Sequence, residues 1–198
     1  MKNKEQLLAH ISAAFPLNEK EIADLCLLFN ERKIKRRGFI LQHGDICKHF
    51  TFIVSGCFKM YGVDQNGKEH NLEFAVENEW LTDLSSFYSE QPGVVYIEAI
   101  EPSTILQISR PDLIYLYANY PKLNSTFRIV IERKYIALQN RVLQNISAGA
   151  EERYVNFITQ FPALANRLPN TQIASYLGIT SEFLSKIRKD LAHKRLNP

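Results

Sequence analysis

The residues whose spacing suggests a specific chemistry lie between Asn170 and Lys189. This stretch predicts two short helices joined by a tight turn, with Ala174 at the crossing point and Gly178 in the turn. Five apolar residues complete the helix-turn-helix pattern: Ile173, Leu177, Ile179, Leu184 and Ile187. A structural helical hairpin can match part of this pattern by chance. Because all the positions match here, we expect an element that enters the major groove of DNA.

The outward face of the second helix carries the side chains expected to contact DNA. Glu182 suits a cytosine amino group as an acceptor, and Lys186 suits guanine O6 and N7 as a donor. Ser181 and Ser185 share this face. Further cations suit phosphates, which add affinity without sequence information: Arg188, Lys189, Lys194 and Arg195. The alternative is a solvated basic face on a hairpin with no DNA partner.

Charge is distributed unevenly along the chain. No Lys or Arg lies between Glu69 and Ser109, whereas Lys and Arg outnumber acidic residues from Ser181 to Pro198. An acidic middle and a basic tail indicate two parts with two functions.

The sequence shows no signal for a membrane or for export. No apolar run approaches the roughly 20 residues of a membrane span, and the N-terminus lacks an apolar signal core. We therefore expect a cytoplasmic protein with no membrane partner.

The elements that must position the motif predict an α+β fold. Amphipathic helices are expected over residues 3–15 and from Asn18 to about Phe29, the latter with a capping box. Residues 34–108 contain short apolar or alternating runs broken by turns, including Asn66-Gly67, which indicates a β-sandwich or barrel. Helical periodicity returns after Ser109 and continues through a long helix over residues 121–147.

That long helix has two apolar stripes. One consists of Phe127, Ile131, Tyr135, Leu138 and Val142, and the other of Ile129, Ile136 and Leu143. A helix that is apolar on two sides requires two partners. We expect one to be its own β-domain and the other the same helix of a second subunit, with the first stripe at the dimer interface. The alternative is a helix buried wholly within one chain.

The order of these segments resembles the Crp/Fnr family of bacterial regulators over nearly the whole chain. The resemblance rests on Gly44-Asp45, on the strand ending at Gly56, on Asn66-Gly67-Lys68-Glu69, and on residues 172–189. It implies a jelly-roll sensor domain in residues 1–120, a dimerisation helix in 121–147 and a helix-turn-helix domain in 148–198. It also implies that Ser181, Glu182 and Lys186 read bases, and it adds RNA polymerase as a candidate partner.

The chain departs from this family in two places. Members that bind cyclic nucleotides resemble one another in Gly-Glu-Leu followed by Arg-Ser or Arg-Thr, whose Glu holds the ribose and whose Arg pairs with the phosphate. Here Thr82-Asp83-Leu84 and Gly93-Val94-Val95 stand instead. An unpaired phosphate in a desolvated pocket is costly, so we expect no good binding of cyclic AMP or cyclic GMP. The second departure is the short stretch after Leu191, which leaves no room for a full wing.

The sequence leaves the effector unknown, and it offers a candidate pocket for one: Trp80, Thr82, Asp83, Leu84, Val94 and Val95. Two other classes of function remain as alternatives. A cupin-like metal enzyme would use His43, His49 or His70, but no two histidines are closely spaced, so we expect neither a metal nor catalysis. A ligand sensor or adaptor would bind protein through its helical tail.

The remaining features point to ordinary structural roles. The widely spaced Cys26, Cys47 and Cys57 indicate neither disulfides nor a metal or iron–sulfur cluster, so no cofactor is expected. The basic run from Arg32 to Arg37 is expected to be a solvated strand edge. The preferred interpretation is a homodimeric transcription regulator that binds double-stranded DNA.

Overall fold

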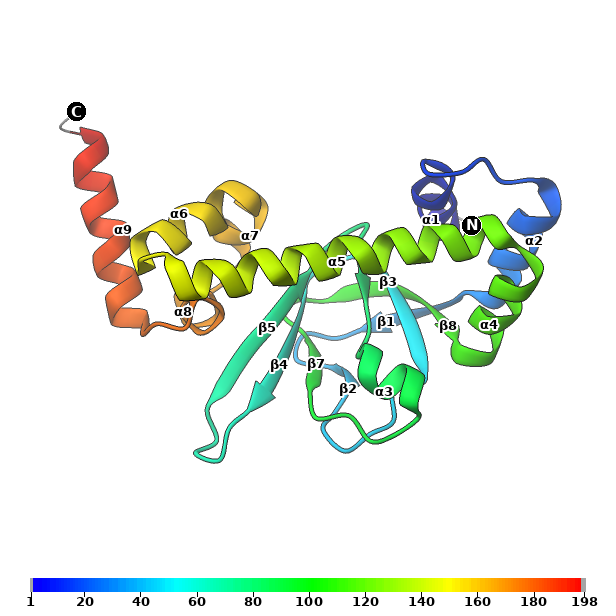
Figure 1. Ribbon diagram of the computed structural model, residues 1–198, viewed down its shortest axis with the longest axis horizontal. Coiled ribbons are helices and arrows are strands. Elements are labelled where there is room, and N and C mark those ends of the chain that lie inside the picture. Colours follow the sequence, from blue (N-terminus) through cyan, green and yellow to red (C-terminus); the bar gives the residue numbers. More distant parts are fainter. Residues whose placement is uncertain (1, 197–198) are drawn as a thin grey trace. The chain divides into compact units, whose positions relative to one another are not determined.

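The computed structural model describes residues 2–196, with side chains described for residues 2–194, and confirms the predicted α+β class (Figure 1). The helices are α1 Lys2–Ser12, α2 Glu19–Leu28, α3 Leu84–Ser89, α4 Arg110–Asn119, α5 Pro121–Ser147, α6 Ala150–Gln160, α7 Pro162–Arg167, α8 Asn170–Leu177 and α9 Ser181–Leu196. The strands are β1 Asn30–Ile34, β2 Phe39–Leu41, β3 His49–Ser55, β4 Phe58–Val63, β5 Glu69–Ala75, β6 Trp80–Leu81, β7 Tyr96–Ala99 and β8 Ser103–Ser109.

The chain divides into two compact units. The first comprises residues 1–62 and 73–133, and the second comprises residues 63–72 and 134–198. The division therefore falls inside α5 and also assigns the tip of the β4–β5 hairpin to the second unit. None of the described helices is long and apolar enough to cross a membrane.

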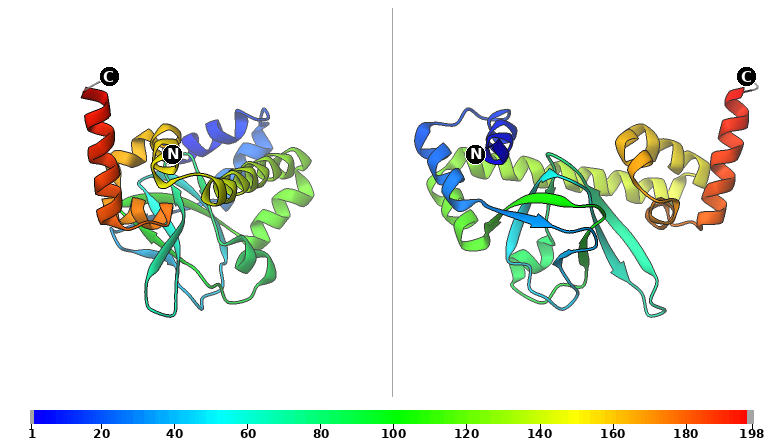
Figure 2. Two further views of the ribbon diagram at one scale, coloured as in Figure 1. Left: turned by 60° about the vertical axis from the view of Figure 1, so that its left-hand side comes forward. Right: turned by 180° about the vertical axis from the view of Figure 1, so that it is seen from behind.

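The first unit is a β-roll of two four-stranded sheets. One sheet has the order β1-β8-β3-β6 and the other the order β2-β7-β4-β5. Figure 2 shows β1 beside β8 from behind, as the antiparallel register of Arg32 with Ile105 requires. The edge position and exposed side chains of β1 agree with the solvated edge expected for the basic run.

Side chains on the two faces of β3 alternate and pack against different parts of the first unit. Phe50 packs against Trp80 and Phe127, with ring centroids 5.5 and 5.6 Å apart. Its neighbour Thr51 points to the opposite face of the strand and pairs with Gln107 of β8. The helix-facing side therefore forms the aromatic core, and the other side faces the interior of the roll.

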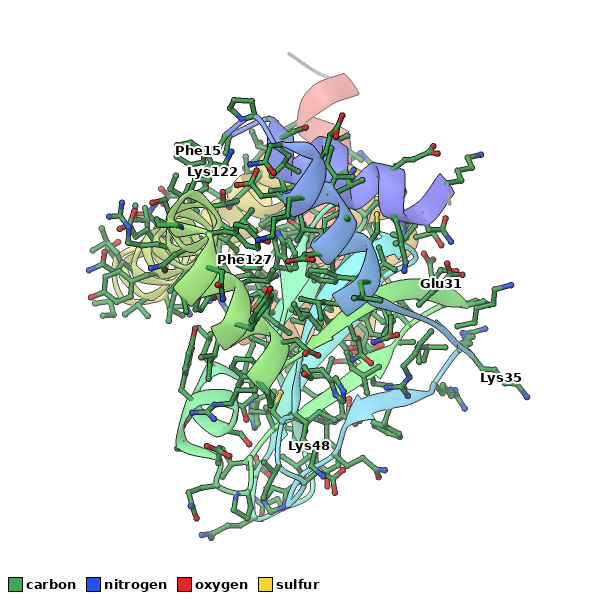
Figure 3. All side chains as sticks on the ribbon, turned by 90° about the vertical axis from the view of Figure 1, so that its right-hand side faces the viewer. Phe15, Glu31, Lys35, Lys48, Lys122 and Phe127 are labelled. Carbon is green, nitrogen blue, oxygen red and sulfur yellow. The ribbon has the colours of Figure 1, made fainter. Side chains whose placement is uncertain are left out.

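Helices α1, α2 and the first half of α5 cover that aromatic core. In α2 the predicted capping box is present: Asn18 accepts a hydrogen bond from the Glu21 amide, and the Glu21 carboxylate accepts one from the Asn18 amide at 2.8 Å. The same carboxylate is 2.8 Å from Lys122 Nζ of α5. Figure 3 shows Lys122 and Phe127 on this helix, with Phe127 directed into the core.

The second unit contains the predicted hairpin turn and a helical bundle. Gly67 has φ +77°, and Asp64 N donates to Lys68 O across the turn. In the bundle, Phe157 of α6 contacts Tyr176 of α8 with ring centroids 5.5 Å apart. The described chain ends within α9, so no wing follows it in the part that the structure describes.

Candidate nucleic-acid interface

The turn between α8 and α9 has the geometry that the sequence predicted. Gly178 is left-handed, with φ 68° and ψ 33°. Its N–H donates to Ser175 O at 3.3 Å, and Ile179 N donates to Ala174 O at 3.0 Å. These two bonds are those of a Schellman motif, which ends α8 and redirects the chain into α9.

Apolar burial then fixes how the two helices pack. Ile173 and Leu184 are fully buried, and Ala174, Leu177 and Ile187 are 2–5% exposed. The small Ala174 lies between larger residues, which allows the backbones to approach closely. Ile179 remains half-buried. The two helices are therefore held by one another, and the outer face of α9 is left for other contacts.

The N-terminus of α9 carries a cap and a carboxylate. Thr180 caps the helix by accepting a hydrogen bond from Phe183 N at 3.2 Å. Glu182 is exposed, and Ser181 Oγ donates to its Oε1 at 3.1 Å. Its own backbone amide, followed by the hydroxyls of Ser181 and Thr180, holds the pKa of Glu182 below its usual value. The side chain is therefore an ionised acceptor, as contact with a cytosine amino group requires.

The predicted cationic contacts fall into two groups. Lys186 and Lys189 are exposed, and neither has a hydrogen bond or ion pair among the side chains that the structure describes. Arg188 is instead half-buried: it donates to Asn170 Oδ1 and lies over the Tyr154 ring, 5.8 Å from its centroid. Lys194 is paired with Glu151 at 2.7 Å.

Two further predicted positions differ from these cations. Ser185 is exposed and donates to Ser181 O at 2.9 Å, so its hydroxyl is satisfied within the helix. The side chain of Arg195 lies outside the described residues. Of the predicted set, Lys186, Lys189 and Glu182 are therefore exposed and have charged groups that no other described element engages.

The hairpin contacts the helix-turn-helix in a way that the sequence analysis missed. The Asn71 side chain donates to Gln172 O and Oε1 at 3.0 and 2.8 Å, and Ser175 Oγ donates to Glu69 O at 2.9 Å. Arg141 donates to Asn71 O and Tyr176 O, and its guanidinium stacks 3.9 Å from the Tyr176 ring centroid. No local pattern signals these contacts, because they join residues 35–106 positions apart.

These contacts border a cavity of about 320 Å³ at the N-terminal end of α9. Its lining includes Lys68 and Asn71 from the hairpin and Ser181 and Glu182 from α9. Ser181 and Glu182 therefore have the hairpin as a neighbour within their own unit. Ser185, Lys186 and Lys189 do not line this cavity.

The candidate effector residues are dispersed in the β-roll. Thr82 lines a cavity of about 270 Å³ in its interior. Trp80 and Val95 lie in the apolar core, Leu84 packs against that core, and Val94 is 70% exposed. The structure therefore brings Thr82 alone among these residues to the cavity.

Asp83 lies close to Gly93, at the two positions where nucleotide-binding relatives carry Glu and Arg. Asp83 caps α3 by accepting a hydrogen bond from Ser86 N at 3.2 Å. A Cβ on Gly93 would lie 2.6 Å from Asp83 Oδ2. This arrangement leaves Asp83 engaged with its own helix, and Gly93 contributes no side chain that could pair with a phosphate.

The residues predicted for the dimer interface occupy different environments along α5. Phe127 is 1% exposed in the core of its own chain, and Ile131 is half-buried. Tyr135, Leu138 and Val142 are 48–60% exposed. The apolar surface open to a partner therefore begins at Ile131, and Phe127 belongs to the covered half of the helix.

A metal site has no support in the described part of the chain. The described residues contain no group of three or more His, Cys, Asp or Glu side chains that could hold a metal ion. No disulfide joins Cys26, Cys47 or Cys57.

Comparison with known proteins agrees with this fold. Residues 31–120 match the cyclic nucleotide-binding domain family. The chain is 25% identical over 186 residues to the probable transcriptional regulator flp of Lacticaseibacillus casei, covering 91% of this chain and 84% of that protein.

Solved structures extend the likeness to the whole architecture. FixK2 from Bradyrhizobium japonicum aligns with TM-score 0.74 and 16% identity over 84% of this chain and 85% of that one. The c-di-GMP responsive global regulator CLP of Xanthomonas campestris aligns with TM-score 0.74 and 13% identity over 90% and 94%. These matches agree with the resemblance to the Crp/Fnr family: the chain has the fold of these two structures, and its residues 31–120 are similar to a cyclic nucleotide-binding domain.

Proposed function

We propose that this chain is a homodimeric, sequence-specific DNA-binding transcription regulator that does not respond to cyclic AMP. The observation that carries the proposal is the outward face of α9, where Lys186 and Lys189 are exposed beside an ionised Glu182. In this proposal Lys186 and Glu182 read bases, while Lys189 contacts phosphate. We further propose that the protein acts in the cytoplasm and is not an enzyme. RNA polymerase is proposed as a further partner.

The second half of α5 supports dimerisation. Tyr135, Leu138 and Val142 expose apolar surface along one side of a helix, at the spacing of a short coiled coil. Pairing of two such helices would bury this surface. It would also place two copies of α9 about 34 Å apart, to match successive major grooves of a near-palindromic site.

The proposed insensitivity to cyclic AMP rests on Asp83 and Gly93. Asp83 is engaged as the cap of α3, and Gly93 stands where relatives have the phosphate-binding Arg. A cyclic nucleotide held there would bury its phosphate without a cation from that position, which is unfavourable. Calorimetry with cyclic AMP should therefore show no micromolar binding.

The direct test of DNA binding is selection of bound sites from random duplex DNA by the purified full-length protein. Fluorescence anisotropy on the selected site then compares Lys186→Ala, Lys189→Ala and the charge-matched control Lys2→Ala. Lys186→Ala should cost about 1–3 kcal/mol and relax one base position, while Lys189→Ala should weaken all sequences and reduce the salt slope by about 1. Lys2→Ala should change neither.

Two outcomes would refute this assignment. If selection returns no enriched sequence and the protein is not retained on duplex DNA at low salt, α9 does not serve as a recognition helix. If Lys186→Ala weakens every sequence equally, Lys186 contacts the backbone and not a base.

A further inference from the structure

The interior of the β-roll contains a cavity that the DNA-binding proposal does not use. It has a volume of about 270 Å³ and lies between the two sheets. Strands of both sheets line it, including Thr51 and Gln107 from one sheet and Leu41 and Ile97 from the other. A cavity of this size is slightly below the roughly 300–1,000 Å³ of typical ligand pockets, so it suits a small molecule.

Buried polar groups form a chain along one wall. Arg32 donates to Gln107 Oε1 at 2.7 Å, and Gln107 Nε2 donates to Thr51 Oγ1 at 3.0 Å. Gln107 and Thr51 are 3% and 1% exposed, whereas Arg32 lies exposed at the mouth. The guanidinium has five N–H donors, and this is its one hydrogen bond among the described side chains. Gln107 thus orients Arg32 and leaves most of its donors available.

Three cationic or basic side chains converge on this cavity. Arg32, Lys48 and His49 all line it. Burial lowers the pKa of His49 below its usual value, and the positive charges of Arg32 and Lys48 lower it further. Because the three side chains line one cavity, an anion bound there would lie near all of them.

One carboxylate also borders the cavity. Asp45 lines it, and Asp45 Oδ2 accepts a hydrogen bond from Gln42 N at 3.3 Å. This acid is exposed and is engaged with its own loop. Neither Arg32 nor Lys48 has an ion pair among the described side chains, so a ligand anion would not have to displace a carboxylate from them.

The remaining wall is apolar. It is formed by three side chains that are 1–4% exposed: Leu41, Leu81 and Ile97. Cys47 also lines it, with its Sγ 3.2 Å from Thr82 Oγ1. An amphipathic molecule would fit this lining, with its charged end at Arg32 and its apolar end among the aliphatic side chains.

This cavity is not the position at which relatives hold a nucleotide phosphate. Asp83 and Gly93 do not line it. Its cations come from β1 and from the loop before β3, outside the cation-free stretch from Glu69 to Ser109. Figure 3 shows Lys48 well separated from Lys122 and Phe127 of α5.

We infer that this cavity is a binding site for a small organic carboxylate with a short apolar body, held through Arg32 with Lys48 and His49 in support. The planar guanidinium pairs with a carboxylate through two parallel hydrogen bonds, which a neutral ligand cannot reproduce. The aliphatic wall excludes water from the rest of the ligand. The site does not depend on the proposed DNA binding.

The test is calorimetry on the full-length protein without DNA, with butyrate as the probe. Butyramide serves as the uncharged ligand of the same shape, and inorganic phosphate as an anion without an apolar body. Butyrate should bind at least about tenfold more tightly than either, because the charge-assisted pair and the apolar contacts act together. Arg32→Ala should abolish the preference for butyrate over butyramide, whereas Arg36→Ala, an exposed neighbour that does not line the cavity, should retain it.

A second measurement needs no variant. Titration of His49 by NMR should show its pKa rise when butyrate is added and stay unchanged with butyramide, because a bound anion favours the charged imidazole. Equal affinity for butyrate and butyramide, no detectable butyrate binding, or binding of phosphate in place of butyrate would each overturn the carboxylate assignment. So would an equal loss in Arg32→Ala and Arg36→Ala.

Discussion

The two units place their functional groups in opposite ways. In the second unit the proposed base-reading residues Glu182 and Lys186 come from one short stretch, and they are exposed on a helix whose inner face is packed. In the first unit the cavity groups come from strands spread along the chain, and Thr51 and Gln107 are almost fully buried. A surface site therefore depends only on helices that are neighbours in the sequence, whereas the interior site forms only when both sheets are assembled.

Strand register explains how the interior site is formed. Thr51 lies directly opposite Gln107, and Arg32 lies opposite Ile105, two residues from Gln107 on the same strand. Residues two apart on a strand share a face. Pairing of β1 with β8 thus brings a cation from the basic run to the mouth of the cavity, whereas the sequence between Glu69 and Ser109 supplies none.

The first prediction tests how strongly the first unit depends on its assembled core. Phe127→Ala should lower the free energy of unfolding by about 3–5 kcal/mol, because it removes a ring that packs against Trp80 and Phe50 and leaves a cavity. Denaturant unfolding monitored through the single Trp measures it. The exposed Asn140→Ala on the same helix should stay within about 0.5 kcal/mol. Similar losses in both variants would contradict the placement of Phe127 in the core.

The second prediction compares a buried ion pair with an exposed one. Burial by itself would raise the pKa of Glu21, but hydrogen bonds from Lys122 and the Asn18 amide outweigh it and hold the pKa below its usual value. The stability from this pair is therefore present above the usual Glu pKa and is lost as pH falls through the lowered one. Glu21→Gln keeps the capping interaction, removes the charge, and should cost about 1–2 kcal/mol at neutral pH, since the Lys122 end is partly solvated.

The measurement is the free energy of unfolding from neutral pH down through the Glu range. Wild type should lose stability over that acidic range, and Glu21→Gln should lose less. Glu151→Gln removes the exposed partner of Lys194 and should leave the curve close to that of wild type. If Glu151→Gln flattened the curve as much as Glu21→Gln, burial would not distinguish the two pairs.

Sequence reasoning succeeded where spacing alone determines structure. The helix over residues 121–147, the turn at Gly178 and the hairpin at Asn66-Gly67 depend on neighbours in the chain, and all three are present. It could not tell which partner covers an apolar stripe, so it placed Phe127 with Tyr135 although their environments differ. It also could not foresee that Asn170 would engage Arg188, because helix packing determines that contact.

The smallest predicted effect concerns the turn between α8 and α9 in the second unit. Gly178→Ala should destabilise the helix-turn-helix by about 1 kcal/mol, because alanine is strained at a left-handed φ of 68°. An added Cβ meets no atom within 4 Å, so backbone strain is the whole cost. Gly149→Ala is the matched control: it also has open space around its Cβ, but its φ is −68°. Hydrogen exchange of α8 and α9 amides should accelerate in Gly178→Ala and not in Gly149→Ala, while butyrate binding in the roll stays unchanged in both. A change in butyrate affinity caused by Gly178→Ala would show that the cavity in the roll depends on the structure of the helix-turn-helix.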